Sequence, residues 1–165
     1  MNKRSLVQST LALALAAFSS GSLLAQDKPL KIGVTAGPHA QIFEQVKKVA
    51  EKDGLKIQIV EFSDYIQPNA ALAAGDLDGN SYQHKPFLDQ QVKDRGYKIV
   101  NVGYTVNFPI GIYSKNAKSP YLNLIAVREQ DKDKPWVAKL VKAYQSETIR
   151  KSVQAEFKGA VLTGF

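Results

Sequence analysis

Cysteine is absent from the 165-residue chain, which excludes disulfides, thiolate metal ligands and a cysteine nucleophile. Histidine is scarce: only His39 and His84 are present, and two histidines so far apart do not form a recognisable zinc site. The Gly-x-Ser-x-Gly elbow of hydrolases and the glycine-rich patterns of phosphate-binding loops are also missing. We therefore expect no enzyme activity, no bound metal and no cofactor.

Basic side chains outnumber acidic ones only slightly. The chain has 22 basic and 15 acidic side chains and a net charge of +7. It has neither an arginine-rich block nor a basic run interleaved with aromatic residues, the features that are typical of nucleic-acid binding. The lysines are spread along helix-like segments, so we interpret them as a solvated surface. Nucleic acid is not an expected partner.

Long hydrophobic runs are missing as well. The apolar run Leu11–Phe18 is much shorter than the ~20 residues of a membrane-spanning helix. Lys3-Arg4 precedes it and the cluster Ser19–Ser22 follows it, which is the layout of a secretory signal peptide. We expect residues 1–25 to be removed after Ala25, with cleavage after Ser22 as the alternative.

The end of this leader resembles the cleavage box of bacterial lipoproteins. The sequence Leu23-Leu24-Ala25-Gln26 has Gln26 where such a box has its lipid-accepting cysteine. Without that thiol no lipid can be attached, so we expect no lipid anchor. The expected product, residues 26–165, is a soluble periplasmic protein of one domain.

The remaining sequence alternates strand-like and helix-like segments. Period-two alternation predicts strands at Leu30–Val34, Leu55–Phe62, Lys98–Val102, Ile110–Tyr113 and Tyr121–Val127. Helical spacing predicts helices from His39 to Gly54 and at Asn69–Ala74, Phe87–Asp94, Trp136–Tyr144 and Ile149–Phe157. This order indicates an α/β domain with a mixed, mostly parallel sheet and helices on both faces.

Three side chains are candidates for a binding pocket. Tyr65 falls in the loop after the strand-like segment that ends at Phe62, and Tyr82 and His84 fall in the loop after the short segment Asp76–Asn80. Ligands of α/β proteins bind beyond the carboxyl ends of strands. Tyrosine offers an apolar face with one polar tip, which suits a small, partly apolar ligand. From the residues alone a second interpretation stays open, in which the aromatic rings pack in a core and His84 has a structural hydrogen bond.

Two motifs in this region, and the sequence around them, resemble a known family. Asp64-Tyr65 is followed at fixed spacing by Pro68-Asn69, and Asn80 begins an Asn-x-x-Gln-His-x-Pro-aromatic-Leu core. Together with KIGVTAGPHAQI before them and SPYLNLIAVREQDKDKPWVAKLVKAYQSETIRKSVQAEFKGAVLTGF after them, they resemble the methionine-binding lipoprotein family of bacterial ABC importers. The resemblance covers the whole mature chain. It implies a lobe of the periplasmic-binding-protein type II fold, in which Tyr65, Tyr82 and His84 line the amino-acid pocket.

The chain departs from that family in one respect. Family members carry a second α/β lobe and close the ligand between two lobes, but here Lys115-Asn116 runs directly into Ala117-Lys118. The resemblance also implies, in the second lobe, an Asp-Pro-x-Asn segment followed by an arginine that holds the ligand carboxylate and by a later asparagine, and these motifs are absent. The resemblance therefore implies one lobe formed from residues 26–116 and 117–165, with the second lobe missing at 116/117.

The function that the resemblance implies is that of a periplasmic solute-binding component for methionine or a similar amino acid. Its partner would be an inner-membrane ABC permease with its ATPase, and the chain would hold only half of the binding site. Losing a charge-assisted hydrogen bond to the ligand costs ~1.5 to 3 kcal/mol, so weak binding is expected. The alternative is a single-lobe interaction module that does not take part in transport.

Overall fold

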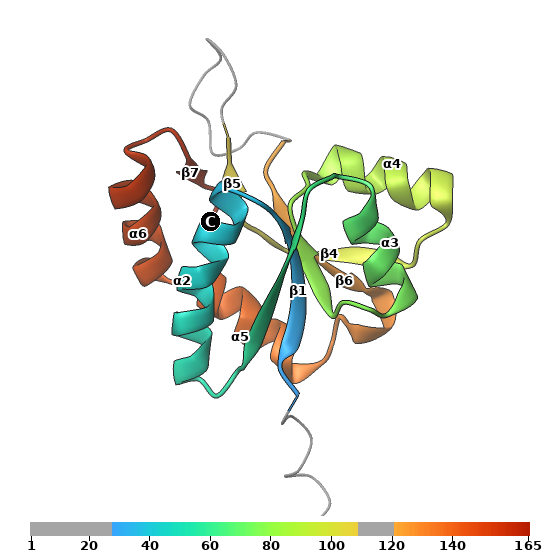
Figure 1. The fold of residues 1–165 in the computed structure, drawn as a ribbon, viewed down its shortest axis with the longest axis horizontal. Coiled ribbons are helices and arrows are strands. Elements are labelled where there is room, and N and C mark those ends of the chain that lie inside the picture. Colours follow the sequence, from blue (N-terminus) through green and yellow to red (C-terminus); the bar gives the residue numbers. More distant parts are fainter. Residues whose placement is uncertain (1–27, 109–120) are drawn as a thin grey trace, which may run out of the picture.

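A five-stranded sheet forms the centre of the part of the chain that the computed structural model describes, residues 28–108 and 121–165 (Figure 1). Its strands lie in the order β2-β1-β3-β6-β4. Their bounds are β1 Leu30–Thr35, β2 Ile57–Phe62, β3 Gly79–Ser81, β4 Ile99–Tyr104 and β6 Leu124–Arg128. The β1/β2 and β1/β3 pairs are parallel, whereas β6 is antiparallel to both β3 and β4. Four strands thus share one direction, which confirms the expected mixed, mostly parallel sheet.

Helices cover both faces of this sheet, as expected. One face carries α2, α5 and α6, and the other carries α3 and α4 (Figure 1). The helices span α2 Pro38–Lys52, α3 Gln67–Ala74, α4 Lys85–Arg95, α5 Pro135–Tyr144 and α6 Glu147–Phe157, and a short 3-10 helix, η1, spans Glu129–Asp131. None of the helices in the described ranges has the length and apolar character needed to cross a membrane.

Local sequence explains where most of these helices begin and end. The first turns of α2, α3, α4 and α5 each contain a proline, whose missing N–H costs nothing at a helix start. The helices α3 and α4 end at Gly75 and Gly96, which adopt left-handed φ angles of 92° and 69° that glycine takes without strain. The helices begin and end within a few residues of the sequence-based expectations.

Two apolar cores hold the layers together. The larger core lies between the sheet and the helices α2, α5 and α6, and its centre includes the fully buried Phe43, Leu140 and Tyr144. The smaller core lies under α3 and α4 around Leu72 and Leu124. Burial of such large side chains at about 25 cal/mol per Å² is the main stabilising contribution for a chain without disulfides.

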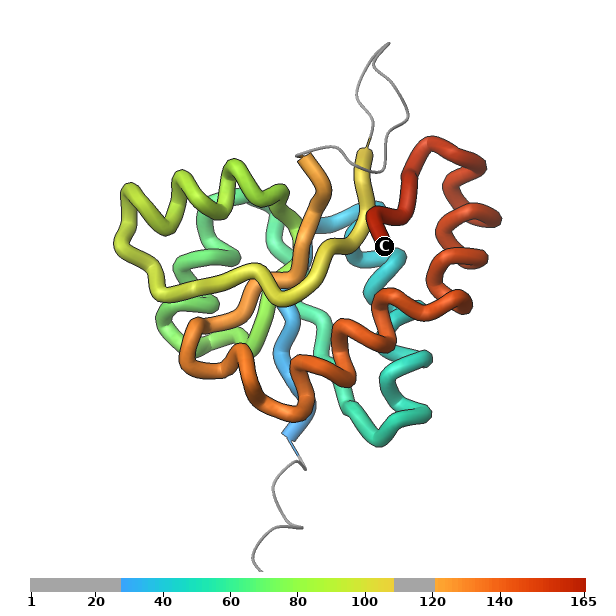
Figure 2. Tube along the Cα trace, turned by 180° about the vertical axis from the view of Figure 1, so that it is seen from behind, coloured from blue at the N-terminus to red at the C-terminus, as the bar shows by residue number. Residues whose placement is uncertain are grey.

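A second, very small sheet joins the two segments of the described chain near the carboxyl edge of the main sheet. It pairs β5 (Val106–Asn107) with β7 (Leu162–Thr163), and the C-terminus lies beside β5 (Figure 2). Close by, the N–H of Thr105 donates to the carbonyl of Asn123 at 2.8 Å, and the N–H of Asn123 donates to the carbonyl of Val106 at 2.9 Å. The chain segments before and after the undescribed range are therefore hydrogen-bonded to each other.

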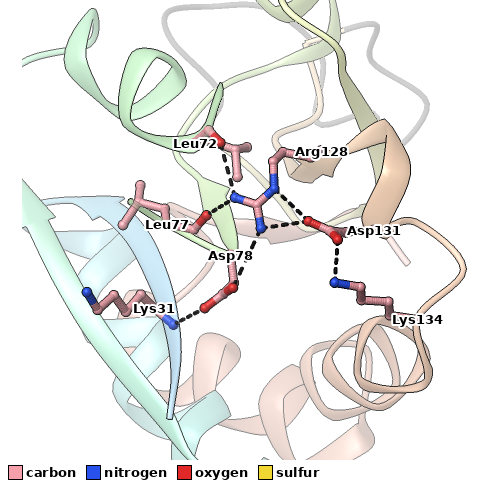
Figure 3. A network of polar contacts seen from close by, with 7 residues as sticks. All are labelled: Lys31, Leu72, Leu77, Asp78, Arg128, Asp131 and Lys134. Carbon is pink, nitrogen blue, oxygen red and sulfur yellow. Dashed lines mark hydrogen bonds and ion pairs between the residues drawn. The ribbon is translucent and has the colours of Figure 1, made fainter. Parts of the chain in front are cut away.

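At the opposite edge of the sheet, Arg128 holds several elements together (Figure 3). Its guanidinium donates to the carbonyls of Leu72 and Leu77 and to the carboxylate of Asp131, with Nε of Arg128 2.6 Å from Oδ2. Burial alone would raise the pKa of Asp131, but the hydrogen bond from Lys134 and the charge of Arg128 outweigh it and hold that pKa below its ordinary value. This cluster ties α3, η1 and the start of α5 to the end of β6.

Several sequence-based expectations lie outside the described residues. They are the signal peptide at 1–25, the strand at Ile110–Tyr113 and the missing-lobe junction at 116/117. The short elements β5, β7 and η1 were not expected from the sequence.

Candidate functional site

The carboxyl ends of β1, β2 and β3 meet at one edge of the sheet. Thr35 lies opposite Phe62, and Val34 lies opposite Ser81, so the loops that follow these strands leave the sheet side by side. The loop after β2 carries Tyr65, and the loop after β3 carries Tyr82 to His84. The expectation that the three candidate residues lie beyond strand ends is confirmed for the described residues.

Tyr82 forms the base of the site. Its side chain is 3% exposed, and its hydroxyl donates a hydrogen bond to the backbone carbonyl of Tyr65 at 3.2 Å. Burial, reinforced by the negative charge of Asp64 and by Tyr97, raises the pKa of Tyr82 far above its ordinary value. The phenol therefore stays protonated and remains a hydrogen-bond donor.

Tyr65 lies on top of Tyr82 and faces solvent. The two rings stack with centroids 6.2 Å apart and planes 29° apart, and Tyr65 is 62% exposed. The turn that carries it is held by Asp64, whose Oδ1 accepts the N–H groups of Ile66 at 2.7 Å and Gln67 at 2.8 Å. An exposed aromatic face held on a buried one gives a flat apolar surface on which a small ligand can lie.

His84 has the structural role that the sequence left open. It is the N-cap of α4, and its Nδ1 accepts the N–H of Phe87 at 3.2 Å. A ring nitrogen that accepts a hydrogen bond carries no proton, which leaves Nε2 as the N–H donor of the ring. Nδ1 is therefore committed to the helix, and Nε2–H is the group available to a ligand.

Two further aromatic rings belong to this cluster. Tyr121 meets the His84 ring edge-on with centroids 5.2 Å apart and is 58% exposed. Phe87 contacts both Tyr82 and His84 edge-on, with centroids 6.3 Å apart in each case. Tyr65, Tyr82, His84, Phe87 and Tyr121 are named here the aromatic cluster. Tyr121 was missed because it is distant in sequence from the other four, and the pairing of His84 with Asn123 that brings it close depends on the tertiary structure.

A buried amide network positions the loop that carries Tyr82 and His84. Gln83 donates to Asn69 Oδ1 at 2.7 Å and to Asn80 Oδ1 at 3.1 Å, and it accepts from Asn69 Nδ2 at 2.8 Å. Asn80 also donates to Asn69 Oδ1 at 2.9 Å. All three side chains are buried. Gln83 therefore points into the protein, whereas its neighbours Tyr82 and His84 take part in the cluster.

Within residues 28–108 and 121–165, no group of three histidine, aspartate or glutamate side chains is placed to hold a metal ion. The concentrated charge around Arg128 lies at the opposite edge of the sheet and is neutralised internally (Figure 3). The aromatic cluster is suited to contact a ligand through ring faces and single N–H and O–H donors.

Comparison with known proteins identifies relatives over most of the chain. The family described as NlpA lipoprotein matches residues 30–119 and 115–165. A D-methionine-binding lipoprotein MetQ of Salmonella typhi is 55% identical over 91 residues, covering 54% of this chain and 34% of that protein. The chain thus spans about a third of the length of this curated relative.

Solved structures show the same fold. A nutrient-binding protein from Burkholderia cenocepacia bound to methionine aligns with a TM-score of 0.78 and 32% identity, over 82% of this chain and 100% of that chain. A periplasmic substrate-binding protein of an ABC transporter from Coxiella burnetii aligns with a TM-score of 0.75 and 25% identity, over 81% of this chain and 99% of that chain. These similarities confirm the type II binding-protein lobe that the sequence indicated.

Proposed function

Because the chain belongs to the NlpA lipoprotein family, we propose that it is a solute-binding component of an ABC importer for methionine or a related amino acid. The observation that carries this proposal is the exposed face of Tyr65 held on the buried Tyr82 at the carboxyl edge of the sheet. The ligand's thioether or other apolar side chain lies against these rings, since sulfur makes favourable contacts with aromatic groups. Nε2–H of His84 supplies a polar contact.

The chain carries half of this site. In the proposed organisation, residues 26–116 and 117–165 form one lobe, and the lobe that encloses the ligand from the other side is missing at 116/117. The limited coverage of the longer curated relative supports this organisation. Methionine binding is therefore expected to be millimolar or weaker, because each lost 1.4 kcal/mol weakens affinity tenfold.

The proposed place of action is the periplasm, and the proposed partners are a membrane permease and its ATPase. The Coxiella burnetii structure, named as a periplasmic substrate-binding protein of an ABC transporter, supports both parts of this proposal. The role is binding without catalysis, in keeping with relatives that are named as binding proteins.

A second candidate function is a single-lobe interaction module that takes no part in transport. The exposure of Tyr65, Ile66 and Tyr121 on one side of the molecule favours it, because neighbouring exposed apolar side chains commonly mark protein contacts. Such a module would bind another protein through the aromatic cluster and would not bind methionine.

Titration of the full chain with L- and D-methionine, followed by NMR and calorimetry, tests the two functions. The transport-type function predicts saturable shift changes centred on Tyr65, Tyr82 and His84, which the double variant Tyr82→Ala/His84→Ala abolishes. Tyr104→Ala is the matched control, since Tyr104 is a part-exposed tyrosine on β4 outside the cluster. Absence of any methionine-dependent shift favours the interaction module, and micromolar or tighter binding contradicts the half-site.

A further inference from the structure

The N-terminus of α2 opens at the same edge of the sheet as the aromatic cluster. The N-cap, Gly37, provides no side-chain hydrogen bond and has a φ of 88°, and Pro38 follows it. The helical ladder begins with the N–H of Gln41, which donates to the carbonyl of Gly37 at 3.0 Å. The N–H groups of His39 and Ala40 in the first turn therefore have no intrahelical acceptor, and such groups with the helix dipole favour an anion.

A buried polar side chain without a partner lies in this first turn. His39 is 7% exposed, and its Nδ1 has no hydrogen-bond partner among the described residues. Side chains on a helix tilt toward its N-terminus, which directs the His39 side chain toward the open end of the turn. Its ring meets Phe108 edge-on with centroids 5.0 Å apart, which fixes the ring from one side. Burial lowers the pKa of His39 to about 4, so the ring is neutral at pH 7 and offers one N–H.

Ser81 is a second buried group without a partner at this edge. It ends β3 opposite Val34, is fully buried, and its Oγ has no hydrogen-bond partner in residues 28–108 and 121–165. Side chains alternate along a strand, and the neighbouring Asn80 points toward α3 through its bond to Asn69. Ser81 therefore points to the other face of the sheet, the face that α2 covers. Native proteins rarely leave buried polar groups unpaired, so two at one edge indicate a site for a polar ligand group.

We propose that the N-terminus of α2, with the His39 imidazole and the Ser81 hydroxyl, is an anion subsite that binds the carboxylate of the amino-acid ligand. This inference rests on the function proposed above and adds to it. Val34 of β1 pairs with Ser81 of β3. Thr35 follows Val34 and leads into the turn before α2, and Tyr82 follows Ser81. The loop that carries Tyr82 and the turn before α2 therefore leave adjacent strands at the same edge of the sheet.

The subsite compensates in part for the missing arginine. Backbone N–H groups at a helix end stabilise a carboxylate without a formal positive charge. They bind it less strongly than a bidentate arginine, in accordance with the weak affinity expected for a half-site. The geometry also assigns His39 and His84 different roles, with His39 beside the carboxylate and His84 beside the ligand's other groups.

Three probes distinguish the parts of the ligand in NMR titrations of the full chain. L-methionine carries both the carboxylate and the side chain, L-methioninol lacks the carboxylate, and sodium acetate provides the carboxylate alone. We expect methionine and acetate to shift the amide of Ala40 and the ring nitrogens of His39 in a saturable manner. Methioninol is expected to shift only the aromatic cluster.

The start of α5 is an internal control, because it also has a proline in its first turn and no side-chain cap. Acetate shifts at Trp136 equal to those at Ala40 would mean non-specific anion binding and would overturn the proposal. It would also be overturned if methionine shifted Tyr82 and His84 but left Ala40 and His39 unchanged, a result that leaves the proposed function intact. If methionine shifts nothing, the proposed function fails, and the acetate titration alone decides whether the subsite exists.

Substitutions test the contributions of His39 and Ser81 one at a time. Ser81→Ala removes one hydroxyl without adding volume and is expected to weaken the acetate response at Ala40 by about threefold or more. His39→Gln retains an N–H donor of similar reach and is expected to retain the response, whereas His39→Leu is expected to lose it. An unchanged acetate response in both Ser81→Ala and His39→Leu, with cooperative unfolding retained, would contradict the role assigned to these side chains.

Discussion

The hydroxyl of Tyr82 donates to the backbone carbonyl of Tyr65 at 3.2 Å while the two rings stack, so one buried residue fixes both the loop and the ring of its exposed neighbour. The stack joins the loop after β2 to the loop after β3. The exposed tyrosine is held in place before any ligand arrives, which reduces the entropy lost on binding.

Tyr82→Phe tests this arrangement, because it removes the hydroxyl and keeps the ring. We expect a loss of about 0.5 to 1.5 kcal/mol in the free energy of unfolding, measured by urea denaturation, and greater mobility of the Tyr65 ring in NMR relaxation. Tyr104→Phe is the control for removal of a tyrosine hydroxyl outside the cluster. Equal Tyr65 mobility in the wild type and in Tyr82→Phe would show that the hydrogen bond does not hold the loop.

Gln83→Ala tests the buried amide network. The substitution leaves polar groups of Asn69 and Asn80 buried without their partner, at a cost of about 1 to 3 kcal/mol. We therefore expect a lower urea midpoint and shift changes that extend to Tyr82 and His84. Gln90→Ala on the exposed face of α4, where Gln90 bonds Asp94, is the matched control and is expected to change stability by less than about 0.5 kcal/mol. Similar midpoints for the two variants would contradict a positioning role for Gln83.

His39 makes stability depend on pH in the mildly acidic range. Its pKa falls from 6.5 in the unfolded chain to about 4 in the folded protein, so the unfolded state binds a proton first as pH decreases. Folding stability is then lost progressively between pH 6.5 and about 4, by roughly 3 kcal/mol at most. His39→Gln is expected to flatten this part of the curve in thermal unfolding at graded pH. An equally steep curve in His39→Gln would assign the effect to other groups.

Asp131 acts in a lower pH range. Its folded-state pKa lies below the ordinary 3.8, so its ion pairs stabilise the fold above that pH and are lost as pH falls through the folded pKa. Asp131→Asn is therefore expected to destabilise the protein at pH 7 and to reduce the additional loss below about pH 3.8. Asp89→Asn, which removes only the exposed pair with Lys85, is the control and is expected to have little effect at either pH.

The fold should melt as one unit. The hydrogen bonds between Thr105 and Asn123 and the pairing of β5 with β7 connect both parts of the chain. We expect the thermal transition to coincide when followed by far-UV and near-UV circular dichroism, as it does for small two-state domains. Separate transitions, or strong dye binding at neutral pH, would mean that the lobe does not pack cooperatively on its own.

Much of the fold could be predicted from the sequence because its elements carry strong local patterns. The apolar stripe of α2 and the alternation in β1 are long enough to identify a helix and a strand. The strands β5 and β7 are two residues each and carry no period, and they exist only because distant segments meet. Pairing between such segments depends on the tertiary structure.

The candidate site was predicted in part. The positions of Tyr65 and Tyr82 at strand ends follow from the alternation of elements, but their stacking requires the two loops to be adjacent, which only the register of β1 with its neighbours determines. The sequence left open whether His84 has a structural or a binding role. In the structure, its Nδ1 accepts a hydrogen bond from the first turn of α4. Gln83 stands between two cluster residues in sequence, yet its amide group bonds Asn69 and Asn80 inside the protein, and these partners are brought to it only by the tertiary structure.

The hydrogen bonds between Thr105 and Asn123 also bear on how this architecture can change in evolution. They hold the segment that ends at Phe108 beside the segment that begins at Tyr121. The entropic cost of closing a loop between fixed neighbouring points grows only slowly with loop length, by about 0.6 kcal/mol for each doubling. Material can therefore be gained or lost between these points without changing the register of the sheet, which makes this place in the chain a natural point for insertion or deletion of a whole lobe.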